Sequence, residues 1–156
     1  MSENLRKVDH IGIAVPDLDV AIQAFTTLFG TGPTAIEDVP DQKVRTAFFA
    51  AGPTNIELLF PTADDSPISN FLAKRGTGIH HICFEVANLA RSLDELRARG
   101  VRLIDETPRP GAHGKRIAFL HPKSTGGVLI ELCEVPHRSG CEPHPMSPHG
   151  TPGSGL

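Results

Sequence analysis

The sequence predicts an α+β fold in which two copies of one small α/β module pack together around a shared core. Residues 8–15 and residues 79–86 have the same pattern of apolar residues around a histidine. Each run is followed by a helical pattern and then by two more strand-like segments, in the same order. A module of about 60 residues buries too little apolar surface to be stable alone, so two modules in one chain are expected to share a core.

The first module, residues 7–64, is predicted to contain one helix and at least three strands. The helix begins after Asp17, whose side chain can cap the first turn, and it ends at Gly30. Strands are predicted over residues 45–49 and 55–59, which are short apolar runs bounded by turn residues. The irregular stretch after the helix has room for one further strand.

The second module, residues 78–136, repeats this order. Its helix begins after Asn88 and ends at Gly100, and its later strands cover residues 116–120 and 129–133. The turn before the last strand is longer than in the first module. It is rich in Pro, Gly, Ser and Thr, which is typical of hairpin connections.

The rest of the chain adds little to the predicted core. Ser66 and Pro67 can start a short helix between the modules, inside a single predicted domain over residues 7–136. Residues 137–156 are rich in Pro, Gly, Ser and His, and we expect this tail to be disordered.

The charge and cysteine content argue against several classes of protein. A formal net charge of −3 with scattered basic residues does not favour binding to nucleic acid or to an anionic membrane. No apolar run approaches the ~20 residues that span a bilayer, and no apolar segment resembles a secretory signal. Three cysteines without a CxxC pair fit reduced thiols better than a disulfide framework, so we expect a cytoplasmic protein.

Two histidines and two glutamates occupy matched positions in the two modules. His10 and His81 lie on the strand faces opposite the bulky residues, which are expected to pack against the helices. Glu57 and Glu131 each lie between apolar residues of a later strand, where a lone buried carboxylate is costly unless it binds a cation. A single strand histidine is more often a hydrogen-bonded core residue. The recurrence of all four residues nevertheless predicts a site for Zn²⁺, Co²⁺, Mn²⁺, Ni²⁺ or Fe²⁺.

Other polar residues are weaker candidates. Four residues near the expected cavity mouth are predicted to bind substrate: Lys115, Arg116, Lys123 and Ser124. A solvated surface explains the three basic ones equally well. His80 is expected to point away from His81 and to be structural, and His113 lies in a predicted flexible loop beside the cavity.

Several segments carry a resemblance to a known family. They include residues 8–15, 78–83, 111–115, 119–124 and 126–132, within a similarity that covers residues 7–135. The last two segments, Phe-Leu-His-Pro-Lys-Ser and Gly-Gly-Val-Leu-Ile-Glu-Leu, are the most specific. On these residues the sequence resembles the vicinal oxygen chelate superfamily of glyoxalases, bleomycin resistance proteins and dioxygenases, and within it the methylmalonyl-CoA epimerase family.

The resemblance implies paired βαβββ modules that form a cupped mixed sheet around one divalent metal ion, with the helices outside, and a homodimer. The implied metal ligands are His10, Glu57, His81 and Glu131. The implied reaction interconverts (2R)- and (2S)-methylmalonyl-CoA through a metal-stabilised enolate. Glu131 is the candidate for moving the C2 proton on one side, and Glu57, Glu85 or a bound water on the other. Some relatives have a glutamate where this chain has Thr46, whose hydroxyl is no comparable base near neutral pH.

Alternatives to an epimerase stay open from the sequence. A glyoxalase I-type lactoylglutathione lyase has an equivalent ligand set and also moves a proton beside a metal ion. A non-catalytic small-molecule-binding member of the superfamily would not need four ligands. A ring-cleaving dioxygenase fits less well, because it typically uses two His and one Glu.

Overall fold

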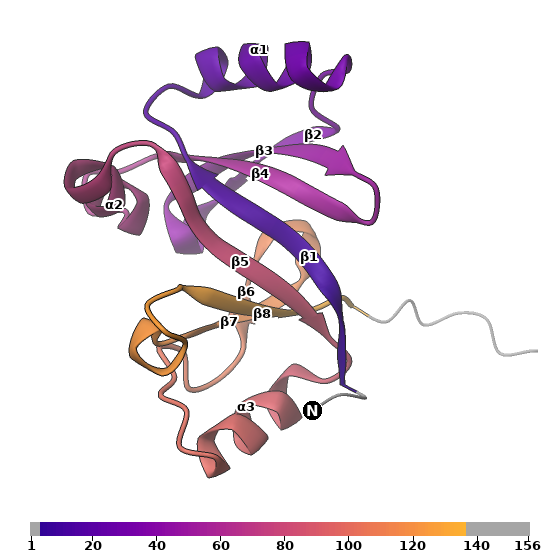
Figure 1. Ribbon diagram of the computed structural model, residues 1–156, viewed down its shortest axis with the longest axis vertical. Coiled ribbons are helices and arrows are strands. Elements are labelled where there is room, and N and C mark those ends of the chain that lie inside the picture. The colour runs from indigo at the N-terminus through magenta and orange to yellow at the C-terminus, as the bar shows by residue number, and fades with distance from the viewer. Residues whose placement is uncertain (1–3, 137–156) are drawn as a thin grey trace, which may run out of the picture.

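The computed structural model describes residues 4–136, which form one curled mixed sheet with helices around it (Figure 1). The strands are β1 (Leu5–Ala14), β2 (Ala35–Val39), β3 (Val44–Ala51), β4 (Thr54–Pro61), β5 (Gly78–Val86), β6 (Arg109–Pro110), β7 (Arg116–Leu120) and β8 (Ile130–Glu134). Their order across the sheet is β2-β3-β4-β1-β5-β8-β7-β6. The two central strands, β1 and β5, are antiparallel, and each has a parallel neighbour from its own module, β4 or β8.

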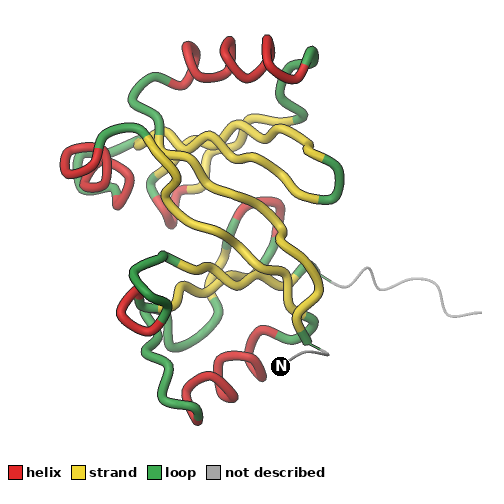
Figure 2. The backbone as a smooth tube through the Cα atoms, in the orientation of Figure 1, coloured by secondary structure: helices red, strands yellow, loops and turns green. Residues whose placement is uncertain are grey.

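The helices lie outside the sheet (Figure 2). The α-helices in the described residues are α1 (Leu18–Phe29), α2 (Pro67–Arg75) and α3 (Leu89–Ala98), and the short 3-10 helices are η1 (Pro40–Gln42), η2 (Ala112–Gly114) and η3 (Pro122–Ser124). The predicted caps are present, because the side chains of Asp17, Asn88 and Ser66 each accept a backbone N–H in the first turn of their helix. Gly30 closes α1 with a φ of 74°, a left-handed conformation that favours glycine.

Each module packs the outer face of its strands against its own helix. Helix α1 covers a cluster that includes Ala47, Phe49 and Leu58. Helix α3 covers a second cluster that includes Ala118 and Leu132. Helices α1 and α3 therefore lie at opposite ends of the molecule in Figure 1, and the inner strand faces are left free to form a site between them.

The expected βαβββ order is present in both modules. The irregular stretch after each long helix contains the extra strand, β2 in the first module and the two-residue β6 in the second. The predicted fold class is confirmed. Among residues 4–136 there is no helix with the length and hydropathy needed to cross a bilayer. The tail predicted to be disordered, residues 137–156, lies outside the described residues.

Candidate metal centre

Three of the four predicted ligands converge at one point on the concave face of the sheet. The Nε2 atoms of His10 on β1 and His81 on β5 are 3.0 Å apart, since the two strands are direct neighbours. Glu131 on β8 places Oε2 2.8 Å from Nε2 of His81 and 3.5 Å from Nε2 of His10. All three side chains are buried. Two modules therefore contribute to a single centre, as the matched positions predict.

Glu57 lies at the opposite edge of the His10 ring. Its Oε1 is 3.2 Å from Nδ1 of His10, whereas His81 and Glu131 approach His10 at Nε2. One donor atom each from His10, His81 and Glu131 lie within 4.8 Å of one another, and Glu57 is outside this group. The structure therefore brings Glu57 beside the centre without making it a member of the three-donor group.

The side chains around the centre fit a divalent metal ion. A void of about 20 Å³ lies among them, lined by His10, Glu57, His81 and Glu131 and walled further by Thr46 and Lys115. A void of that size has room for about one water-sized particle. Two imidazole nitrogens and a carboxylate suit the borderline divalent transition metals, and three protein ligands leave a position for an oxygen from a substrate.

The electric field at the centre favours a positive charge. Burial alone would lower the pKa of His10, but its hydrogen bonds to the carboxylates of Asp9 and Glu131 raise that pKa to about 10. Burial would likewise raise the pKa of Glu131, yet its hydrogen bonds to His10 and His81 hold it at about 2. A buried cation is therefore stabilised at this point.

The two matched carboxylates have opposite tendencies. Burial raises the pKa of Glu57 to about 7, and the nearby His10 only partly opposes this shift. Glu131, which touches both imidazoles, stays ionised. Pairs of acids whose pKa values are driven apart are a common arrangement in sites that move protons.

Asp9 supports His10 and was not identified from the sequence. Its Oδ2 is 2.7 Å from Nδ1 of His10, and the same oxygen accepts a hydrogen bond of 2.7 Å from Nζ of Lys115. These two partners outweigh the effect of burial and keep the pKa of the Asp9 carboxyl well below its usual range. A carboxylate on Nδ1 holds the imidazole with Nε2 toward the centre, as in many metal sites.

A strand irregularity explains how Asp9 and His10 come to lie together beside the centre. In a regular strand Asp9 and His10 would point to opposite faces. The pairing of β1 with β5 shifts register between Val8 and His10, and both side chains are buried beside the centre. The signal in the sequence was an aspartate within an apolar strand directly before the histidine.

His80 has a different place from the one expected. Its Nδ1 lies 3.0 Å from Nδ1 of His81, and its ring packs edge-on against Phe71 of α2 at a centroid distance of 5.1 Å. The prediction that His80 points away from His81 is therefore wrong. A second register shift in the β1–β5 pairing, between Gly12 and Ile13, lies next to this point. Burial lowers the pKa of His80 to about 4, so its imidazole is neutral at pH 7.

The residues predicted to bind substrate lie in three different places. Lys115 reaches the centre through Asp9. Lys123 and Ser124 lie in η3, where the Oγ of Ser124 accepts a hydrogen bond from the N–H of Arg102. The prediction that Arg116 binds substrate is corrected, because its guanidinium binds Glu134 at 3.0 Å on the outer side of the sheet, beside α3.

Of two further candidates, Glu85 lies away from the centre and His113 lies beside it. Glu85 is paired with Arg6 at 3.5 Å and Lys7 at 3.7 Å at the far end of β5, so it does not face the void. His113 lines the void, and its ring lies 4.2 Å from that of Phe48.

The fold and the centre define a class of proteins, and the comparisons agree with it. The sequence profile of the Glyoxalase/Bleomycin resistance protein/Dioxygenase superfamily matches residues 9–119. The chain therefore belongs to that superfamily.

Within the superfamily, the chain is similar to epimerases over most of its length. It is 45% identical over 129 residues to a Dictyostelium discoideum protein named methylmalonyl-CoA epimerase, over 82% of this chain and 78% of that one. An ethylmalonyl-CoA/methylmalonyl-CoA epimerase of Cereibacter sphaeroides is 42% identical, over 83% of this chain and 98% of that one. The crystal structure of methylmalonyl-CoA epimerase from Mycobacterium tuberculosis has a TM-score of 0.84 at 41% identity, over 88% and 93%. A lactoylglutathione lyase of Arabidopsis thaliana is only 26% identical, over 83% and 44%.

Proposed function

We propose that this chain is a metal-dependent epimerase that interconverts (2R)- and (2S)-methylmalonyl-CoA by removing and returning the proton at C2. The observation that carries the proposal is the buried meeting point of His10, His81 and Glu131, with a further carboxylate, Glu57, at the other edge of the His10 ring. The similarity to epimerases over most of the chain supports the same substrate class.

The centre would stabilise the charge that forms when the C2 proton leaves. Loss of that proton places negative charge on the thioester oxygen, and a divalent ion held by His10, His81 and Glu131 would supply Lewis-acid stabilisation there. The protein residues contribute burial, which excludes bulk water and strengthens each electrostatic contact.

Inversion at C2 requires groups that deliver and accept a proton on opposite sides of that carbon. Glu131 and Glu57 lie at opposite edges of the His10 ring, at Nε2 and Nδ1 respectively. Glu57 is outside the three-donor group, so its carboxylate is available to hold or release a proton. Thr46 lines the same void, but its hydroxyl has no comparable acidity or basicity. We therefore assign one proton-transfer role to Glu57 and the other to Glu131, which would leave the ion partly free when it takes the proton.

Four finer features belong to the proposal. We expect the ion to be Co²⁺, Zn²⁺, Mn²⁺ or Ni²⁺, which all accept nitrogen and oxygen ligands. We also expect a homodimer and a cytoplasmic location. We expect ethylmalonyl-CoA to be a second substrate, since one relative carries both names.

A deuterium-exchange experiment tests the reaction. Metal-loaded protein is incubated with (2R)- or (2S)-methylmalonyl-CoA in deuterated water, and the epimer ratio and deuterium content at C2 are followed. Both epimers should reach the same mixture with one deuterium incorporated. The hemithioacetal of glutathione and methylglyoxal should not turn over. Turnover of the hemithioacetal alone would favour a lyase, and metal retention without either reaction would favour a binding protein.

The Glu57→Gln variant tests the two-sided assignment. If Glu57 serves one side of C2, this variant should epimerise at least ~100-fold more slowly and still exchange deuterium into one epimer without inversion. Glu85→Gln is the matched control, because that carboxylate is paired with Arg6 and Lys7 away from the void. An unchanged epimerisation rate in Glu57→Gln would remove its role.

A further inference from the structure

A tight turn between β6 and β7 carries Lys115 to the centre. Its element η2 contains two successive residues with a left-handed backbone, His113 with a φ of 56° and Gly114 with a φ of 68°. The N–H of Lys115 donates to the carbonyl of Ala112 at 3.1 Å, and the carbonyl of Lys115 accepts from the N–H of Gly111 at 2.9 Å. A left-handed backbone is unfavourable for a residue other than glycine, so the surroundings of His113 must hold the turn in this shape.

The same turn is fastened to the first module. The backbone N–H of His113 donates to both carboxylate oxygens of Glu37 on β2, at 3.2 and 3.3 Å, and the His113 ring lies 4.2 Å from that of Phe48 on β3. Strands β2 and β6 are the two edges of the curled sheet, and the turn after β6 reaches across to the first module (Figure 1). The position of Lys115 is therefore set by both modules.

Lys115 contacts the carboxylate that supports His10. Its Nζ is 2.7 Å from Oδ2 of Asp9, and the same oxygen is 2.7 Å from Nδ1 of His10. The side chains of Lys115 and Asp9 are only 15% and 3% exposed. Burial alone would lower the pKa of Lys115, but the hydrogen bond to Asp9 raises that pKa above its usual value, so the ammonium group stays charged. Asp9 is therefore fixed between an ammonium group and an imidazole.

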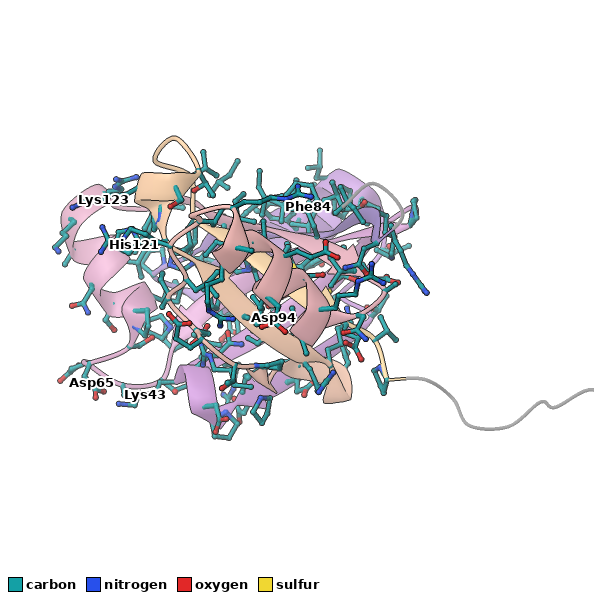
Figure 3. The ribbon with its side chains drawn as sticks, turned by 90° about the horizontal axis from the view of Figure 1, so that it is seen from below. Lys43, Asp65, Phe84, Asp94, His121 and Lys123 are labelled. Carbon is teal, nitrogen blue, oxygen red and sulfur yellow. The ribbon has the colours of Figure 1, made fainter. Side chains whose placement is uncertain are left out.

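A lysine–aspartate pair elsewhere in the chain shows why burial matters. Lys43, directly after η1, pairs with Asp65, and both side chains project from the surface of the molecule (Figure 3). They are 45% and 70% exposed, and such a pair fixes its partners weakly because water competes for both charges. The pair of Lys115 and Asp9 is shielded from water, so loss of one partner should disturb the other.

Two carboxylates approach the same edge of the His10 ring. Oδ2 of Asp9 is 2.7 Å from Nδ1, and Oε1 of Glu57 is 3.2 Å from the same atom. When Nε2 faces a cation, Nδ1 carries the single ring hydrogen, and that hydrogen can make one short hydrogen bond. Lys115, which lines the void together with Glu57, holds the Asp9 oxygen toward Nδ1. The Nδ1 hydrogen is thus directed to Asp9 and away from Glu57.

We propose that Lys115 is a positioning residue, which holds Asp9 on Nδ1 of His10 and so keeps Glu57 free for proton transfer. Without the ammonium group, Asp9 would no longer be fixed, and the Nδ1 hydrogen would be donated to Glu57. The part played by Glu57 rests on the proposed function, whereas the action of Lys115 on Asp9 and His10 does not. The proposal replaces the sequence-based expectation that Lys115 binds substrate.

Steady-state kinetics test this role. Lys115→Met removes the charge and keeps a side chain of similar length, and it should lower kcat for epimerisation by about tenfold to a hundredfold with KM for methylmalonyl-CoA unchanged. Lys115→Arg, which keeps a hydrogen-bonding cation, should recover most of kcat. Lys7→Met is the matched control, because Nζ of Lys7 is 3.9 Å from the other oxygen of Asp9 and its side chain is 40% exposed; kcat and KM should not change. A raised KM with an unchanged kcat in Lys115→Met would show that Lys115 binds substrate and overturn the proposal.

A double-mutant cycle tests whether Lys115 acts through Asp9. In a protein that already carries Asp9→Asn, adding Lys115→Met should change kcat by less than about twofold, because the connection to His10 is already lost. An equal loss of kcat in both backgrounds would show that Lys115 acts by another route, and the positioning role would be overturned.

Proton NMR of the His10 ring distinguishes failure of this proposal from failure of the proposed function. In zinc-loaded and in metal-free protein, the Nδ1 proton bonded to Asp9 should give a downfield resonance. Lys115→Met should shift or remove this resonance, and Lys115→Arg and Lys7→Met should keep it. That result in a protein without epimerase activity would keep the positioning role and remove the reaction. An active protein whose resonance and kcat are unaffected by Lys115→Met would overturn the positioning role alone.

Discussion

The two modules contribute matched histidines to one centre, but they support them differently. In the first module the residue before the histidine is Asp9, a buried carboxylate that binds His10 and Lys115. In the second module the same position is His80, a neutral imidazole that touches His81 and lines a groove beside α2. The histidines are alike, whereas the residues before them differ. The histidine of the first module is therefore supported by a charged side chain, and that of the second module by a neutral one.

The matched glutamates also differ between the modules, in their contacts and in the direction of their pKa shifts. Glu131 lies between both imidazoles, and those contacts keep it ionised. Glu57 meets only the far edge of His10, and burial raises its pKa. The matched glutamates therefore lie in different surroundings, which agrees with the proposal that Glu131 holds the ion and Glu57 transfers a proton.

The largest expected effect tests this difference between the glutamates. Glu131→Gln should lose at least ~100-fold in epimerisation and most of the bound metal, because it removes both a ligand and a proton-transfer group. Glu57→Gln should keep its metal. The check is metal content by elemental analysis alongside deuterium exchange. Equal loss of metal in the two variants would show that the modules are alike and that Glu57 is a ligand.

The supports of the two histidines should differ in strength. Asp9→Asn removes the negative charge on Nδ1 of His10 and should weaken metal binding by about tenfold to a hundredfold. His80→Asn removes only a neutral partner and should weaken it less. Competition with a chelator gives both affinities. A larger effect of His80→Asn than of Asp9→Asn would contradict the assignment of the stronger support to Asp9.

The close contact between the modules can be tested at a glycine. A methyl group on Gly12 would lie 2.4 Å from Cε1 of His81, whereas one on Gly78, at the start of β5, would meet nothing within 4 Å. Gly12→Ala should lower the free energy of unfolding by about 1–3 kcal/mol and also weaken metal binding. Gly78→Ala is the control in the same strand pair. Denaturant unfolding and the chelator assay measure the two effects, and equal values for both variants would argue against tight packing of His81 on β1.

The smallest expected effect concerns two matched arginines on the outer surface. Arg45 and Arg116 lie near the start of β3 and β7, and their half-exposed guanidinium groups pair with Asp38 on β2 and with the more covered Glu134 on β8. Arg45→Gln and Arg116→Gln should each change the free energy of unfolding by less than about 1 kcal/mol and leave KM unchanged. A raised KM in Arg116→Gln would restore it to the substrate site.

The repeat made much of this arrangement predictable. The helix caps follow from Asp17 and Asn88, and the matched strands led to the histidines and glutamates because side-chain alternation is regular over most of each strand. The same rule failed for His80, and it would also have separated Asp9 from His10. Register shifts in the β1–β5 pair lie beside both residues. A bulge has no clear signal in a single sequence.

Alternation could also have corrected one prediction. Lys115 and Arg116 are consecutive, and Ile117 faces the void from β7, so Arg116 must face outward. The groove beside α2 could not be predicted from the sequence for another reason. It joins α2 with a loop that follows η3 far along the chain, and only the folded structure shows that Lys74 and Val128 border one space.

The seam between β1 and β5 has a consequence for how folding can be watched. His10 comes from one half of the chain and His81 from the other, and they meet only when Gly12 is paired with His81. Slippage by one residue would turn the imidazoles to opposite sides. A coloured ion such as cobalt, added during refolding, would therefore report the docking of the two halves at the right register, separately from the earlier formation of helices.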